Sequence, residues 1–99
     1  MPVAFDEVIE KITLAARQVE ADGGASPVLV AILREFERKL AKAEQQATAG
    51  APDRESVIEL EQAGDSAKVA AEADMGLSSD ARESVLAAHL AICKLKAGA

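Results

Sequence analysis

The residues best suited to chemistry in this sequence are its one histidine and its one cysteine, His89 and Cys93. They are four residues apart, so on a helix their side chains lie on one face. An imidazole and a thiolate at this spacing can share a zinc ion, which then needs two more ligands. Glu61, Asp65 or the same pair from a second chain are the candidates for those ligands. In the alternative interpretation both side chains belong to the core, with the histidine tied to a carboxylate or carbonyl group.

The surrounding pattern favours the core interpretation. A helix over residues 79–97 places His89 in the middle of an apolar face, and that face is formed by Val85, Leu86, Ile92 and Cys93. There is no second histidine or cysteine in the chain, and no Glu-x-x-His spacing of the kind found in di-iron bundles. A cysteine nucleophile also needs an orienting group and oxyanion donors, and the sequence offers only a base. We therefore predict no catalytic residue, no metal, no cofactor and no enzymatic activity.

Two short segments resemble known helical families. The stretch AHLAICK resembles the reactive-histidine segment of histidine phosphotransfer domains, which implies phosphate carried on His89, although Lys94 follows five residues later and no glycine follows closely. The stretch GDSAKVAAEADMG is similar to the attachment site of acyl carrier proteins, which implies phosphopantetheine on Ser66. The leucine that follows the serine in that family is replaced here by Ala67. A carrier or phosphotransfer module and a metal-binding bundle therefore remain the alternative hypotheses.

Length and charge exclude several classes of protein. The 99 residues predict a single domain spanning residues 1–99. With 17 acidic and 11 basic residues the net charge is −6, which repels phosphate backbones, and there is no Trp or Tyr to stack on bases. The longest apolar run, PVLVAIL, is much shorter than the ~20 residues that cross a bilayer, and no signal peptide is recognisable. We expect a cytoplasmic protein that binds neither nucleic acid nor membranes.

Apolar residues recur at steps of three and four along most of the chain, which predicts amphipathic helices. Ser26 followed by Pro27 is a strong helix start, and glycine-containing breaks separate the periodic segments. The predicted helices cover residues of about 4–21, 27–48, 53–74 and 79–97. The fold class is therefore all-α, with four helices in an antiparallel bundle. Each half is a helix, a glycine turn and a helix, but the residues show no repeat strong enough to indicate duplication.

Many of the apolar residues are small, because 22 of them are Ala and only two are Phe. Alanine buries little surface, so the core is thin for its length and self-association is expected. A glycine inside a helix costs about 1 kcal/mol relative to Ala, so Gly64 calls for a close neighbour. We predict a small protein that acts by protein–protein interaction, first as a homodimer, with a second protein partner left open. The predicted contact residues are Val28, Val30, Gly64, Ala67 and Ala71.

Overall fold

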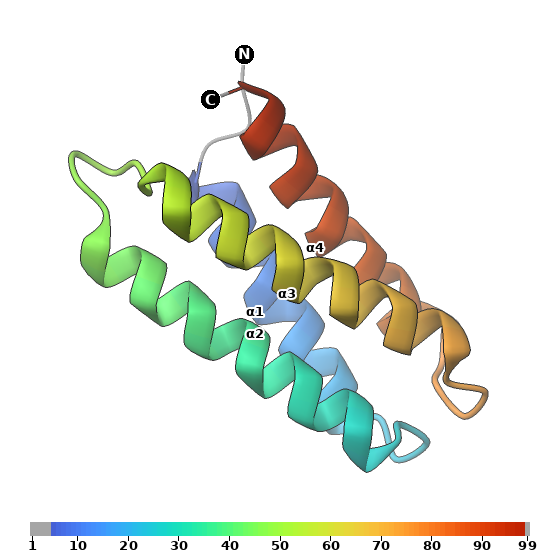
Figure 1. Ribbon diagram of the computed structural model, residues 1–99. Coiled ribbons are helices and arrows are strands. Elements are labelled where there is room, and N and C mark those ends of the chain that lie inside the picture. The colour runs from blue at the N-terminus through green and yellow to red at the C-terminus, as the bar shows by residue number, and fades with distance from the viewer. Residues whose placement is uncertain (1–4, 99) are drawn as a thin grey trace.

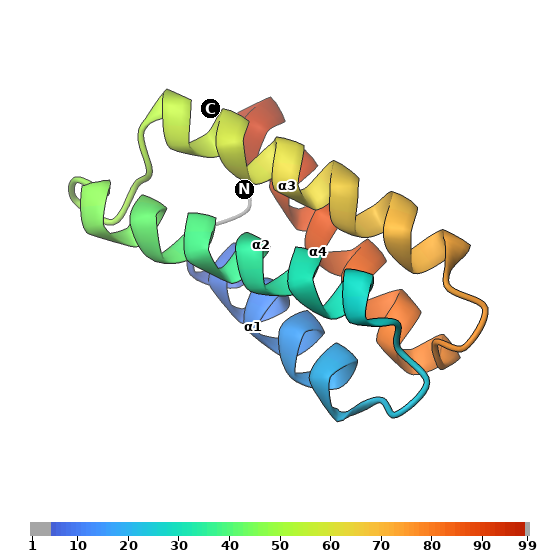
Figure 2. The same ribbon diagram turned by 60° about the horizontal axis from the view of Figure 1, so that its bottom comes forward.

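The computed structural model describes residues 5–98 as a bundle of four α-helices. The helices are α1 (Phe5–Ala21), α2 (Pro27–Gln46), α3 (Arg54–Ala73) and α4 (Ser79–Gly98). Figures 1 and 2 show that consecutive helices run antiparallel, and each helix packs against its two neighbours. The predicted all-α bundle is confirmed, and the helix bounds agree within two residues, apart from residue 4, which lies outside the described residues. Among the described residues, no helix has the length and apolarity that crossing a membrane would require.

The core runs along the bundle axis and takes side chains from all four helices. The largest fully buried ones include Ile12, Leu33, Phe36, Leu60 and Ile92. Burying each such side chain stabilises the fold by roughly 1.5–3 kcal/mol. Between them lie fully buried small residues, namely Ala15, Ala67, Ala71 and Ala88. These small residues let the helices approach closely, so a core with few large side chains still packs densely.

The structure reveals an internal repeat that the sequence reading missed. The two helical hairpins, α1–α2 and α3–α4, are related by a shift of 52 residues, the distance from Ala21 to Ala73 along the chain. This shift takes the end of α1 to the end of α3, the start of α2 to the start of α4, and the end of α2 to the end of α4. Both segments between the hairpin helices read Ala-Asp-x-Gly-x-Ser. The bundle is therefore a pair of equivalent hairpins packed about a pseudo-twofold axis.

Burial follows the same shift. Equivalent buried pairs are Phe5 and Val57, Val8 and Leu60, Ile12 and Gly64, Ala15 and Ala67, Val19 and Ala71, Leu29 and Ala81, Leu33 and Val85, Phe36 and Ala88, and Leu40 and Ile92. The identities differ because volume is divided unequally between the hairpins: Phe36 of the first lies against Gly64 of the second. Because a large side chain of one hairpin packs against a small one of the other, the core remains filled. Equivalent positions then differ in residue type, and the repeat is hard to recognise in the sequence.

The two hairpin turns lie side by side at one end of the bundle (Figures 1 and 2) and exchange hydrogen bonds. Asp22 accepts from the backbone N–H of Gly24 in its own turn at 2.9 Å and from that of Ser78 in the other turn at 2.8 Å. Asp74 repeats the arrangement, accepting from Gly76 at 3.0 Å and from Ser26 at 2.8 Å. Each carboxylate therefore holds its own turn and joins the two hairpins.

The same turns touch through two glycines. A Cβ atom added to Gly24 would overlap the carbonyl oxygen of Gly76, and one added to Gly76 would overlap the carbonyl oxygen of Gly24. The obstacle is backbone in both cases, so no side chain can move aside. Gly23, the neighbour of Gly24, has open space around its Cα.

At the opposite end of the bundle, α2 and α3 are joined by a tight turn. Ala49 and Gly50 have φ angles of 54° and 80°, and Thr48 and Ala51 exchange two backbone hydrogen bonds across them. Asp53 then caps α3 by accepting from the N–H of Ser56 at 2.7 Å. This turn has no equivalent in the pseudosymmetry, because it connects one repeat to the next.

Replacing Gly24 or Gly76 with Ala should destabilise the protein by roughly 1–3 kcal/mol, since the added methyl group forces the two turns apart. Gly23→Ala is the matched control and should change the free energy of unfolding by less than about 0.5 kcal/mol. Urea denaturation followed by circular dichroism measures all three variants. Equal stability of Gly24→Ala and Gly23→Ala would contradict the close approach of the turns.

Acid should weaken the contact between the turns. The Ser78 and Gly24 N–H groups lower the pKa of the Asp22 carboxyl, and the Ser26 N–H group chiefly lowers that of Asp74. A carboxyl with a lowered pKa in the folded state contributes stability above its unfolded value, about 3.9, and that contribution is lost as pH falls through the folded value. Unfolding free energy should therefore fall below about pH 4.

The variant Asp22→Asn/Asp74→Asn tests this origin. It should be less stable than the natural protein at pH 7 and should lose less stability between pH 5 and pH 2. The double variant should still lose some stability in acid because of Asp53 and Glu59. The Ser56 N–H group lowers the pKa of Asp53, and the Lys39 ammonium lowers that of Glu59. Glu44→Gln removes one charge from the exposed surface of α2 and should leave the acid profile unchanged. An unaltered profile in the double variant would refute the assignment.

Candidate functional site

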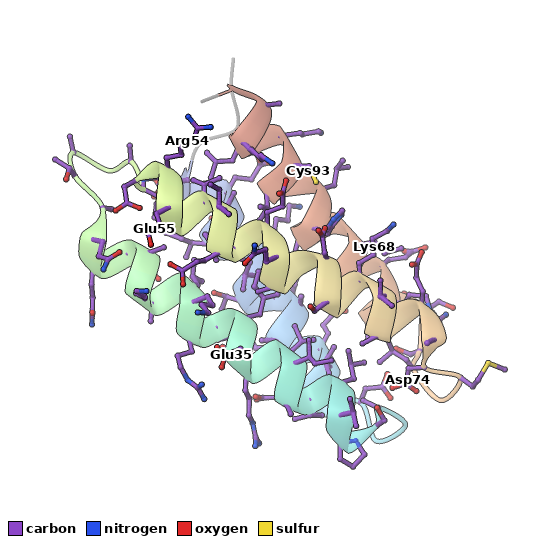
Figure 3. The ribbon with its side chains drawn as sticks, viewed as in Figure 1. Glu35, Arg54, Glu55, Lys68, Asp74 and Cys93 are labelled. Carbon is purple, nitrogen blue, oxygen red and sulfur yellow. The ribbon has the colours of Figure 1, made fainter. Side chains whose placement is uncertain are left out.

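The structure brings His89 to a carboxylate rather than into the centre of the core. His89 on α4 and Asp65 on α3 are joined by a hydrogen bond of 2.6 Å between Nε2 and Oδ1. The His89 side chain is 19% exposed and that of Asp65 is 61% exposed. Cys93, one turn further along α4, is half-buried, with its Sγ 3.8 Å and 3.9 Å from the two ring nitrogens (Figure 3 labels this cysteine).

The prediction that His89 occupies the middle of the buried face of α4 was wrong. That face is formed instead by Ala81, Val85, Ala88, Ala91 and Ile92. Helix α4 packs against both α1 and α3, so its buried face centres one residue away from His89, which falls at the edge toward α3. Gly64 lies beside the ring: a Cβ atom added there would be 3.6 Å from His89 Cδ2, an ordinary contact, and 3.3 Å from Ile92 Cδ1, which is tighter.

The geometry of the Asp65, His89 and Cys93 side chains limits their chemistry. Each ring N–H or lone pair points outward in the plane of the imidazole, so a sulfur almost equidistant from both nitrogens is aligned with neither. Glu61, proposed as a further metal ligand, instead binds Lys96 at 2.9 Å. Over residues 5–98, no three His, Cys, Asp or Glu side chains come close enough together to hold a metal ion. What the His89–Asp65 hydrogen bond does is join α3 to α4.

Ser66 does not have the position that the carrier-protein resemblance implies. It is exposed in the middle of α3, whereas the attachment serine of acyl carrier proteins opens a helix. His89, the residue implied by the phosphotransfer resemblance, is three-quarters or more buried and bonded through Nε2 to Asp65. The geometry therefore supports neither of these two alternatives.

Three of the predicted contact residues lie inside the chain's own core. Ala67 and Ala71 have no exposed surface, and Gly64 faces Phe36 and Ile92. The small-residue face of α3 is thus used for packing within the bundle and is not available to a second chain. Of the other two predicted residues, Val28 is 67% exposed and Val30 is half-buried against the core.

Arg82 has a structural role that its spacing did not reveal. Its guanidinium donates to the backbone carbonyls of Ala71, Asp74 and Leu77, at distances from 2.9 to 3.3 Å. These carbonyls belong to the last turn of α3 and the segment after it, where a helix leaves acceptors without internal partners. Arg82 therefore caps α3 from the start of α4 and is not free to bind an anion.

Exposed apolar side chains gather beside the hairpin turns, where α2 begins and α3 ends. Val69 is 65% exposed and Met75 is 95% exposed, and Val28 lies one turn before Ile32 on α2. Ile32, Val69 and Ala73 line a shallow groove of about 480 Å³ between the two helices. The Ser26–Asp74 hydrogen bond holds the start of α2 against the end of α3, so these residues form one surface. We call Val28, Ile32, Val69, Ala73 and Met75 the turn-end patch.

The repeat provides an internal comparison for this patch. The positions equivalent to Val28, Ile32, Val69 and Met75 are occupied by Asp80, Ser84, Arg17 and Gly23. On that side Ser84 donates to Gln18 at 2.6 Å, so the seam between α1 and α4 is closed by a polar contact. An equivalent backbone therefore folds with polar residues or glycine at these positions, so the bundle does not depend on large apolar side chains there.

A second hollow lies at the other end of the bundle. It has a volume of about 550 Å³ and is lined by Pro52, Arg54, Val57, Ile58 and Lys96. The Lys96 ammonium is already bound to Glu61, and the rest of the lining is mainly apolar. We assign it no ligand.

No protein-family model, curated protein or solved structure in the comparisons matches this chain.

Zinc provides a direct check on the histidine and cysteine. Titration of the intact protein with zinc in a calorimeter should give no tight one-to-one binding, because the Asp65, His89 and Cys93 side chains do not converge. His89→Gln and Cys93→Ala serve as controls and should give the same heats as the natural protein. Stoichiometric binding that either substitution removes would overturn this conclusion.

Proposed function

We propose that this protein is a small, non-enzymatic interaction module of the cytoplasm that binds other polypeptides, including a second copy of itself, through the turn-end patch. The observation that carries the proposal is the difference between the two halves of the repeat. Beside the hairpin turns, Val28, Val69 and Met75 are exposed between α2 and α3, whereas the equivalent positions between α1 and α4 are Asp80, Arg17 and Gly23. Exposed apolar surface of this kind is typical of protein contact sites.

The composition of the patch also fits a binding role. A methionine exposed over almost its whole surface adapts its flexible side chain to different partners. The groove beside it offers side chains of α2 and α3 in two parallel rows, four residues apart in each helix. Such a groove is suited to the apolar face of another helix.

The structure gives little support to an enzymatic alternative. Among the described residues, every buried side-chain nitrogen or oxygen has a hydrogen-bond partner. No buried polar side chain there is left without a partner that a ligand could supply. The one histidine is committed to Asp65 and is not aligned with the cysteine. These observations favour binding over catalysis.

Self-association should be weak at low salt and stronger at high salt. The net charge of −6 repels a second copy, and raising the ionic strength from about 0.1 M to about 1 M shortens the screening length from about 10 Å to about 3 Å. Sedimentation equilibrium at millimolar protein should therefore show a dimer fraction that grows with salt. Val69→Ser should lower that fraction, because it removes apolar contact from the patch.

Leu90→Ser is the matched control for this experiment. Leu90 is 54% exposed on α4, outside the patch, so the substitution removes a similar exposed apolar side chain. It should leave the dimer fraction unchanged. A monomer at every salt concentration would count against self-association, and equal effects of the two substitutions would count against the patch.

A further inference from the structure

We propose that the preferred partner of the turn-end patch is an amphipathic helix with basic residues flanking its apolar face. This inference rests on the proposed function and adds the chemistry of the partner to it. The argument comes from the charges around the patch and from the shape of its groove.

Acidic side chains surround the patch. On α3, Asp65 lies one turn before Val69 and Glu72 lies one turn after it, and Asp74 directly precedes Met75. Asp74 is held ionised by backbone donors, which lower its pKa. Figure 3 shows Asp74 at the turn end of the bundle, with Glu35 further along α2.

The basic residues of this region are largely committed to other groups. Lys68 lies 4.0 Å from Glu72 and Arg38 is paired with Glu35. Arg82, the other basic residue between positions 65 and 83, donates to three backbone carbonyls. On α3 and the turn after it, residues 65–76 contain three acidic residues, Asp65, Glu72 and Asp74, against one basic residue, Lys68, so this side of the apolar groove carries a net negative charge.

Charge therefore distinguishes a second copy of the chain from a basic helix, which apolar contact alone would not do. A second copy brings its own acidic residues against these, and like charges facing each other oppose association. A basic helix places cations beside Asp65, Glu72 and Asp74 and is attracted to them before contact. The apolar groove fits either occupant, but the charges around it favour the basic helix.

The shape of the groove fits a helix. Val28 and Ile32 on α2 and Val69 and Ala73 on α3 are each spaced by four residues, so they form two rows along neighbouring helices. A ridge of apolar side chains at positions i, i+4 and i+7 of a third helix can lie between such rows. Lysine or arginine residues next to that ridge then reach the acidic residues at the edge of the groove.

The test uses two synthetic helical peptides with identical leucine positions, one carrying lysine and the other glutamate on the polar face. Fluorescence anisotropy measures their binding to the intact protein, and ¹⁵N chemical shifts locate the site. The lysine peptide should bind with shifts centred on the patch, and its affinity should fall as salt rises. The glutamate peptide should bind at least about tenfold more weakly.

Matched variants assign the binding to named groups. Val28→Ser/Val69→Ser should weaken the lysine peptide about tenfold or more, whereas Leu90→Ser leaves its affinity unchanged. Asp65→Asn/Glu72→Gln should weaken it severalfold and reduce the salt dependence. His89→Gln removes the hydrogen-bond partner of Asp65 but leaves the Asp65 charge in place. This variant should bind the lysine peptide as tightly as the natural protein does. Positions 28 and 69 correspond to Asp80 and Arg17 in the other repeat, so the fold accepts polar residues there.

Several results would overturn the inference. Equal binding of both peptides at the patch, or a second copy that the lysine peptide fails to displace, would contradict the basic partner while leaving the binding patch standing. Lysine-peptide binding that Val28→Ser/Val69→Ser does not change would show general attraction to an acidic protein, and this too would overturn the inference. Failure of both peptides and of a second copy to contact the patch would refute the proposed function as well.

Discussion

The close approach of the two hairpin turns is the contact on which the arrangement of this bundle depends. Gly24 and Gly76 bring the two backbones together, and Asp22 and Asp74 each accept one N–H from their own turn and one from the other. These bonds hold the two hairpins together at one end of the bundle. A carboxylate can do this because it offers two acceptor oxygens, one for each turn.

The pseudo-twofold arrangement explains how a chain rich in alanine forms a packed core. Large side chains of the first hairpin, such as Phe36, are accommodated by small residues of the second, such as Gly64. The thin core expected from composition therefore reflects an unequal division of volume between the two hairpins. It gives no independent reason for a second copy of the chain.

The same symmetry separates residues needed for folding from residues available for function. Buried positions correspond between the repeats, whereas the residues on the outer surfaces differ. Beside the hairpin turns, the seam between α1 and α4 has Asp80, Ser84 and Arg17, whereas the seam between α2 and α3 exposes Val28 and Val69 beside acidic residues. A surface that differs between two equivalent hairpins is not dictated by the common backbone, and the turn-end patch is such a surface.

The sequence by itself determined the four helices, because apolar periodicity, the Ser26-Pro27 start and glycine breaks are local signals that do not depend on how a helix packs. It also predicted Val28 as a contact residue and a close neighbour for Gly64. The motif Ala-Asp-x-Gly-x-Ser in both turns was a sign of the repeat in the sequence. The repeat was not recognised because equivalent core positions carry different residue types. Only the tertiary structure decided which face of α4 is buried, that His89 meets Asp65, that Arg82 caps α3, and that the small residues of α3 face inward. Each of these depends on which helices are neighbours, and that is set by contacts between residues far apart in the chain, such as Asp22 with Ser78.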